Sequence, residues 1–224
     1  MKLEISTDAS TTTFNTMLNP EDRIFGCSGA ISITTGDEEY IVSPDTTNNR
    51  SELLAVYLGL KLAKRIMDMD PERYDELIIY SDSQLAVKGL TEWIHTWEMN
   101  KDIHGVLRRT DGGVVLNQEL YLCIISFVVL NKIKVSFKHV SGHINLNNPM
   151  SLRKAEETYY RMNKEFLKPE EVYKVTYYNN LVDNRTRSRL KYVNPDKYKR
   201  YNYSNNYRIM VNYILPVNYK EYIS

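Results

Sequence analysis

The stretch Leu77–Trp97 reads LIIYSDSQLAVKGLTEWIHTW, and its pattern predicts the centre of the fold. The four residues Leu77–Tyr80 form a short, continuous apolar run, which is typical of a strand buried on both faces of a sheet. Asp82 follows at the end of that strand, and Ser83–Trp97 then has the residue pattern of a helix. A buried strand that ends in an acid and leads into a helix is typical of an open α/β sheet, in which ligand sites form outside the strand ends.

Three more strands are predicted before this stretch. Leu3–Thr7 alternates apolar and polar residues and ends at Asp8. Gly29–Thr35 and Glu39–Ser43 are two further strands, separated by a Gly-Asp turn signal. We therefore expect an antiparallel meander in this part of the chain. Thr11–Phe25 is polar and irregular, and we expect it to be a loop.

The segments that follow the meander predict helices that alternate with strands. Ser51–Met67 has apolar residues at helical spacing, and Asn48 or Asn49 can cap it. Asn117–Leu130 is another helix, and Lys134–His139 alternates as a strand. The order predicts an α/β fold with a mixed five-stranded sheet, in which three antiparallel strands are followed by parallel strands and helices flank the sheet.

Composition and charge limit the class of protein. The 224 residues fit one domain with extensions, and the formal net charge is only +1. A nucleic-acid-binding surface would therefore have to concentrate its basic residues locally. The two cysteines, Cys27 and Cys123, lie far apart and the sequence has no Cys/His cluster, which argues against a zinc site.

The opening residues and the longest apolar run bear on targeting and membrane contact. The opening residues MKLEISTDAS contain no apolar core of signal-peptide length, and the apolar run Tyr121–Leu130 is too short to span a bilayer. We expect a cytoplasmic monomer with no membrane contact. The 18 tyrosines and the many Asn and Lys residues suggest an AT-rich coding genome, such as that of a virus or phage.

Three acids stand at the ends of predicted elements. Asp8 and Asp82 end strands, and Glu52 lies in the first turn of a helix. If the two strands are neighbours, the three carboxylates converge, and divalent cations such as Mg²⁺ or Mn²⁺ would offset their repulsion. The alternative is structural, because strand ends are solvated and a helix N-terminus favours negative charge.

The segments around these acids resemble a known family. Four motifs occur in one order: STDAS at Ser6–Ser10, TTNNRSELLAV at Thr46–Val56, YSDSQLAVKGLTEWIHTW at Tyr80–Trp97 and KVSFKHVSGH at Lys134–His143. Together they resemble the motifs of ribonuclease H type 1. The resemblance implies an RNase H-like fold that cleaves the RNA strand of RNA–DNA hybrids with two Mg²⁺ ions, or Mn²⁺, and leaves 3′-hydroxyl and 5′-phosphate ends. Removal of replication primers or hybrids is the role that we expect.

The resemblance also implies roles for single residues. Asp8, Glu52 and Asp82 match three metal-binding, catalytic acids of the family, and His143 matches a histidine that assists product release or proton transfer. The family's last acid usually follows that histidine closely, whereas here the match resumes as YNNLVDNRTRSRL, with Asp183 at the position of the acid, 40 residues after His143. We therefore expect Asp183 to be the fourth ligand, with Glu156 as the nearer competitor.

Further residues match positions that contact nucleic acid in the family: Thr47, Asn48, Asn49, Gln84, Trp93 and Trp97. Amides suit the hybrid's minor groove, because the 2′-hydroxyl both donates and accepts hydrogen bonds. The alternative is helix capping for Asn48 and Asn49, and capping or a turn for Thr47. For the two tryptophans the alternative is core packing.

Two segments depart from the family. Residues 144–178 form a predicted helical insertion, with an apolar stripe from Leu152 to Phe166 that Pro169 ends. We assign residues 1–190 to the nuclease domain and residues 191–224 to a basic, Tyr- and Asn-rich C-terminal extension, a candidate contact for partners. The basic residues from Arg185 to Tyr207, which include Arg187 and Lys191, are interleaved with tyrosines and are a candidate contact for nucleic acid; the alternative is a solvated helix face followed by a tail. The extension ends in the strand-like sequence YRIMVNYILPV.

The family's basic handle has only a modestly basic counterpart, residues 99–113 (MNKDIHGVLRRTDGG). Three functions therefore compete: an active ribonuclease H, a catalytically weak or inactive nucleic-acid-binding module, and a nuclease of the same fold with another nucleic-acid substrate. Retention of the acids favours catalysis, and the amides at Asn48, Asn49 and Gln84 favour the hybrid as the binding partner.

Overall fold

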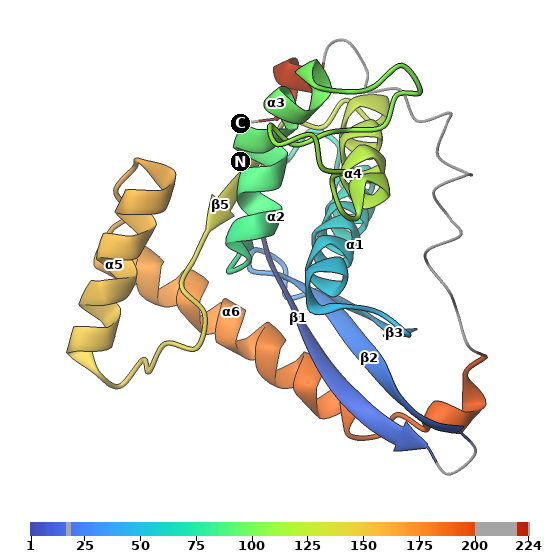
Figure 1. Cartoon of the computed structure of the whole chain (residues 1–224). Coiled ribbons are helices and arrows are strands. Elements are labelled where there is room, and N and C mark those ends of the chain that lie inside the picture. The colour runs from blue at the N-terminus through green and yellow to red at the C-terminus, as the bar shows by residue number, and fades with distance from the viewer. Residues whose placement is uncertain (17–18, 200–218, 224) are drawn as a thin grey trace.

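A computed structural model describes residues 1–16, 19–199 and 219–223. Its sheet has five strands: β1 (Lys2–Thr16), β2 (Asn19–Ser32), β3 (Glu38–Pro44), β4 (Glu76–Ser81) and β5 (Val135–His139). The strand order is β3-β2-β1-β4-β5. The first three strands pair antiparallel, whereas β4 pairs parallel with both β1 and β5. The predicted mixed sheet is therefore confirmed (Figure 1).

Helices cover both faces of the sheet. They are α1 (Asn48–Met69), α2 (Gln84–Lys88), α3 (Ile94–Met99), α4 (Gln118–Leu130), α5 (Pro149–Asn163) and α6 (Pro169–Leu190), with a π-helical turn η1 (Gly89–Trp93) between α2 and α3. Figure 1 shows α1 and α4 on one side of the sheet and α6 on the other, with α5 packed beyond β5. In the described part of the chain, no helix combines the length and apolarity needed to cross a bilayer.

The continuous apolar run of β4 is explained by these two layers. Leu77 and Ile79 point into the large core that α1, α2 and α4 cover. Ile78 and Tyr80 point to the opposite face, where they pack with Tyr159 of α5 and Val175 of α6. Because successive side chains of a strand alternate between faces, a strand buried on both sides needs apolar residues at every position.

The predicted loop at Thr11–Phe25 is wrong. Backbone pairing of β1 with β2 continues past Ser10 through Thr12↔Phe25 and Thr13↔Ile24, which forms a long hairpin. Threonine is β-branched and favours extended backbone, so a polar threonine run is compatible with a strand. Phe25 is fully buried, and it packs in a small apolar cluster with Leu190 of α6.

Two helix boundaries also differ from expectation. Thr47, rather than Asn48 or Asn49, caps α1, and its side chain accepts a hydrogen bond from the Arg50 backbone N–H. Pro169 begins α6 instead of ending α5, which stops at Asn163. Proline suits the first turn of a helix, because the N–H that it lacks has no partner there.

The segment predicted as an insertion is helical, but its expected boundary at residue 178 lies inside α6, which runs without interruption from Pro169 to Leu190. The helix α5 is tied to the edge of the sheet. Asn163 accepts a hydrogen bond from the His139 N–H (2.8 Å) and donates one to the His139 carbonyl (2.8 Å). The His139 ring lies 3.1 Å from the Asp82 carbonyl. The helix α5 therefore supports the strand end beside Asp82.

The C-terminal segment returns to the body of the protein. Tyr219 is 1% exposed and packs in the large core, and its hydroxyl lies 2.6 Å from His95 Nδ1. The Val135 N–H donates to the Tyr222 carbonyl (2.8 Å), and Val135 pairs with Ile223 in a parallel bridge. The strand-like sequence predicted within residues 207–217 lies outside the described residues.

We predict that Tyr219→Ala lowers the free energy of unfolding by about 3 kcal/mol, because a buried aromatic ring and its hydrogen bond are lost. Chemical denaturation measures this loss. Tyr192→Ala is the matched control, since Tyr192 is 87% exposed, and we expect a change within about 0.5 kcal/mol. Equal stabilities of the two variants would show that the C-terminal segment does not anchor the fold.

Candidate active site

Parallel pairing of β1 with β4 brings two of the acids together. Asp82 follows the end of β4, as predicted, but β1 continues past Asp8 to Thr16, so the prediction that the first strand ends at Asp8 is wrong. β1 and β4 pair in parallel as far as Thr7↔Ser81, so Asp8 and Asp82 follow at neighbouring positions. Glu52 reaches them from the second turn of α1. One carboxylate oxygen from each of these three residues lies within 4.8 Å of the others. Asp8 is 3% exposed and Glu52 is 6% exposed, so the cluster is largely shielded from water.

Burial and mutual repulsion raise the pKa values of these carboxyls. The pKa of Asp8 rises to about 9, first because of burial and then because of the charges of Asp82 and Asp183. Burial and the charges of Asp8, Asp82 and Asp183 likewise hold the pKa of Glu52 well above its usual range. Burial also raises the pKa of Asp82, against the hydrogen bond from Asn179. The cluster therefore favours protons or cations.

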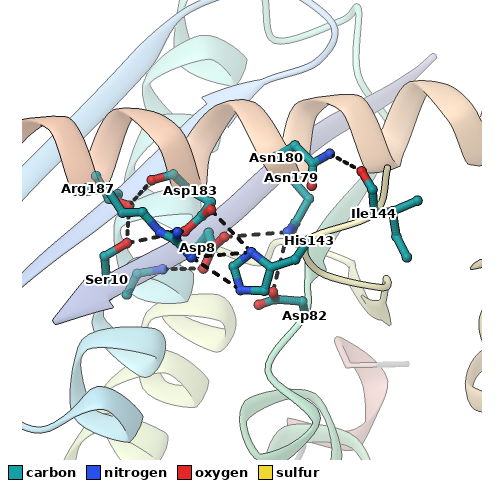
Figure 2. Close-up of polar contacts among 11 residues, drawn as sticks. Asp8, Ser10, Asp82, His143, Ile144, Asn179, Asn180, Asp183 and Arg187 are labelled. Atoms are coloured by element: carbon teal, nitrogen blue, oxygen red, sulfur yellow. Dashed lines mark hydrogen bonds and ion pairs between the residues drawn. The ribbon is translucent and has the colours of Figure 1, made fainter. Parts of the chain in front are cut away.

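Asp183 approaches the cluster from α6 and is 7% exposed. Its Oδ1 accepts a hydrogen bond from Arg187 Nε at 2.8 Å, and its Oδ2 lies 3.3 Å from His143 Nδ1 (Figure 2). The Ser10 hydroxyl donates a longer bond to Oδ1 at 3.4 Å. Asp183 is not within the 4.8 Å group, but its charge raises the pKa values of Asp8, Glu52 and Asp82.

Asn179 lies between Asp8 and Asp82. It is fully buried, and its Nδ2 is 3.4 Å from both Asp8 Oδ2 and Asp82 Oδ2. These distances are at the long limit of hydrogen bonding, so the amide offsets the negative charge only in part. Asn179 Oδ1 and Glu52 Oε2 are buried without a hydrogen-bond partner among the described residues. Buried acceptors of this kind are costly unless a donor or a cation reaches them.

His143 lies on the loop after β5 with a left-handed backbone (φ 54°), and its side chain is 62% exposed. Arg187 Nη2 is 3.3 Å from the ring, and Asn180 holds the loop by donating a hydrogen bond to the Ile144 carbonyl at 2.8 Å. Position 142 requires glycine for a steric reason, because a Cβ there would lie 2.0 Å from Asp82 Oδ2.

A cavity of about 660 Å³ opens over the acids. It is lined by the four predicted acids Asp8, Glu52, Asp82 and Asp183, together with His143, Arg187 and Lys191. The competing acid, Glu156, lies on α5 and does not line this cavity. The structure thus brings Asp183, rather than Glu156, to the other three acids.

The residues expected to contact nucleic acid are distributed over a wider surface. Asn48 lines the cavity and accepts a hydrogen bond from Thr11 Oγ1 (3.4 Å). Thr47 caps α1, and Asn49 lines a second cavity of about 460 Å³. Gln84 is exposed at the start of α2 and lines neither of these two cavities.

Both tryptophans line the second cavity. Trp97 is 8% exposed and packs edge-on against Tyr121, as core packing requires, whereas Trp93 is 38% exposed. The arginines of the modestly basic segment 99–113 are paired internally: Arg108 with Asp102 at 2.8 Å and Arg109 with Asp111 at 3.1 Å. These two arginines are therefore partly neutralised.

Sequence reasoning missed several contributors. Ser10 and Gly142 had no assigned place in the site, and Arg187 was expected only within a basic stretch, although its position four residues after Asp183, where side chains meet on a helix, indicates the pairing with that acid. Ser10 could have been identified by alternation from Asp8. The contact of Asn179 with two acids has no sequence signal other than the place of Asn179 in the stretch YNNLVDNRTRSRL, which resembles a family motif.

Comparisons with known proteins agree with the geometry. A ribonuclease H of Legionella pneumophila (strain Lens) is 34% identical over 102 residues, which are 45% of this chain and 62% of that protein. A ribonuclease H of Thiobacillus denitrificans is 31% identical over 117 residues, which are 51% of this chain and 69% of that protein. The matches thus span about three fifths of the length of such relatives.

A solved type 1 RNase H with the type 2 active-site motif is 21% identical, with a TM-score of 0.43, and the match covers 72% of this chain and 74% of that one. The model of the RNase H family matches residues 3–158, so the matched range contains Asp8, Glu52, Asp82 and His143 and ends before Asp183. Since this range is more than half of the sequence, the chain belongs to the RNase H family.

Proposed function

We propose that this protein is a ribonuclease H that hydrolyses the RNA strand of RNA–DNA hybrids at the Asp8, Glu52, Asp82 and Asp183 cluster. The observation that carries the proposal is the convergence within 4.8 Å of three carboxylates, the buried Asp8 and Glu52 and the partly buried Asp82, on segments that match the RNase H family. Buried like charges at this separation are unfavourable for folding, which argues for a functional use.

The donor set fits a hard divalent cation. Carboxylate oxygens suit Mg²⁺ or Mn²⁺, and Glu52 Oε2 and Asn179 Oδ1 are buried acceptors without a partner among the described residues. We assign Asp8, Glu52, Asp82 and Asp183 as the residues that hold two such ions. Bound there, the ions would activate a water and neutralise charge on the phosphate, leaving 3′-hydroxyl and 5′-phosphate ends.

The chain's own residues then position the reacting groups. Arg187 fixes the orientation of Asp183 through its Nε–H, and Ser10 donates a weaker bond to the same oxygen. We assign His143 to proton exchange with the leaving oxygen, because its ring is exposed and lies beside Asp183, and its place on a loop suits product release. Burial of Asp8 and Glu52 excludes bulk water from the carboxylate cluster.

Recognition of the hybrid is assigned to amides and aromatic rings. Asn48 and Asn49 open onto neighbouring cavities from the start of α1, and Gln84 is exposed at the start of α2. Amides read the 2′-hydroxyl as donor and acceptor, which distinguishes RNA from DNA. Trp93 is exposed enough to contact the second strand, whereas Trp97 supports it from the core.

The decisive measurement is cleavage of labelled substrates. We predict that the protein with Mg²⁺ cleaves RNA–DNA hybrid but neither duplex RNA nor duplex DNA, and that EDTA or Asp82→Asn abolishes cleavage. Asp22→Asn, which removes an exposed acid outside the cavity, should retain full activity. Hybrid binding without cleavage would favour the binding-module alternative, and cleavage of another duplex would favour a different nuclease.

The fourth acid can be tested separately. We predict that Asp183→Asn lowers the cleavage rate by about a hundredfold or more, because a carboxylate of the cation site is lost. Glu156→Gln should leave the rate unchanged, since Glu156 does not line the cavity. If only Glu156→Gln is inactive, the assignment of Asp183 is wrong.

The raised carboxyl pKa values make the metal-free protein sensitive to pH. The pKa of Asp8 is about 9 in the folded protein, against an ordinary value of 3.8, so folding favours the protonated carboxyl. The unfolded chain ionises first, and the free energy of unfolding should therefore fall as the pH rises between those two values. Thermal unfolding in EDTA at a series of pH values measures this decrease.

Addition of Mg²⁺ should reverse the loss at high pH, because the cation binds the ionised carboxylates of the folded state alone. Asp8→Asn should stabilise the metal-free protein at neutral and higher pH and weaken its response to Mg²⁺. Asp22→Asn serves as the control and should retain both the pH dependence and the response to Mg²⁺. A melting temperature in EDTA that does not fall with pH would contradict the burial of charge in this cluster.

A further inference from the structure

The cavity over the acids extends well beyond them. Its lining includes Thr12 and Phe14 near the end of β1 and Lys191 just after α6. We propose that this extension is a second binding subsite, which holds a phosphate and its nucleotide on the RNA strand next to the bond that is cut. The proposal rests on the proposed ribonuclease H function and specifies how the same site holds its substrate.

The walls of the extension arise from two regular elements. On β1, alternate residues share one face, so Ser10, Thr12 and Phe14 continue the row that begins at Asp8. On the opposite wall, Asp183, Arg187 and Lys191 follow one another at intervals of four residues, which places them on one side of the helix. All of these residues line the same cavity.

Charge changes sign along the cavity. The carboxylates occupy one end, and Arg187 and Lys191 provide cations that follow at steps of about 6 Å, which is four residues of helical rise. Arg187 pairs with Asp183 through its Nε but is 55% exposed, and Lys191 is exposed and has no ion pair among the described residues. Lys191 can therefore approach a phosphate that lies beside the acid cluster, and the exposed part of the Arg187 guanidinium can reach it while its Nε–H holds Asp183.

The other basic residues of α6 face elsewhere. Arg185 and Arg189 both pair with Glu38 of β3, and the Arg189 guanidinium lies 3.6 Å from the centre of the Tyr40 ring. The helix thus divides its cations between the sheet and the cavity. A merely solvated helix face, the usual explanation of a charge run, would not show this division.

The far end of the extension is apolar. Phe14 lies edge-to-face against Phe25, with 5.4 Å between the ring centres, and Phe25 is fully buried. Leu190 is 4% exposed and lines the same end. A supported aromatic ring beside cations suits a nucleotide, because the ring contacts the base or sugar while the cations bind the phosphate.

Salt-dependent binding tests the subsite. Affinity of an RNA–DNA hybrid is measured by fluorescence anisotropy over a range of salt concentrations, without divalent cation. We expect Lys191→Ala to reduce the slope of log K against log salt by about 0.9, the contribution of one phosphate contact. Lys61→Ala is the matched control, because Lys61 is an exposed lysine of α1 outside the cavity, and it should leave the slope unchanged.

Substrate length gives a second, independent readout. With Mg²⁺ and a long hybrid, Lys191→Ala should raise KM, because a contact with the substrate phosphate is lost. It should leave kcat unchanged, because Lys191 is not one of the acids assigned to the cation site. Two shortened hybrids are then compared, in which the RNA keeps only one nucleotide beyond the cut on its 5′ side or on its 3′ side, so that the scissile bond remains and the neighbouring phosphate is removed. The effect of Lys191→Ala should vanish with one of them, which identifies the side that the subsite holds. Phe14→Leu should raise KM on the same long hybrid only.

The outcomes separate this inference from the proposed function. If the unmodified protein cleaves hybrids while Lys191→Ala and Lys61→Ala share one salt slope and one KM, the subsite is wrong and the ribonuclease assignment stands. An effect of Lys191→Ala that persists on both shortened hybrids would also overturn the subsite. If the unmodified protein neither binds nor cleaves hybrids, both proposals fail.

Discussion

Parallel pairing between β1 and β4 is the interaction on which the arrangement of the site depends. It sets Thr7 opposite Ser81, so that the next residues, Asp8 and Asp82, lie side by side where β4 ends and β1 continues. The pairing is secure because β4 is apolar on both faces and lies between two layers of helices. A shift of one residue would exchange the faces on which those side chains pack and turn the acids to the wrong faces.

The carboxylate cluster that results is unfavourable in itself, and the surrounding residues reduce the cost. Asn179 contacts two of the acids through one amide, and Arg187 pairs with Asp183. These contacts do not offset the burial and mutual repulsion of the acids, which raise the pKa of Asp8. A fold that stabilises such a cluster only in part remains dependent on cations for its full stability.

Two segments that depart from the family resemblance reinforce the edge of the sheet. The helix α5 is bound to β5 through Asn163, and the C-terminal residues add a parallel bridge at Val135. Since an edge strand exposes unpaired backbone groups, these contacts protect β5. The contact with α5 also acts close to Asp82, because Asn163 holds the backbone of His139, whose ring is in contact with the Asp82 carbonyl.

The sequence alone determined the order of strands and helices and the three acids Asp8, Glu52 and Asp82, because these depend on local patterns and short motifs. It did not determine the hairpin over Thr11–Phe25, where pairing between strands overrode a polar composition. Nor could it bring Asp183 to the other acids, since the intervening α5 and the start of α6 have no fixed direction until they pack on β4 and β5. Tertiary packing decided that step, and with it the cavity between β1 and α6, because such contacts join residues more than 170 positions apart.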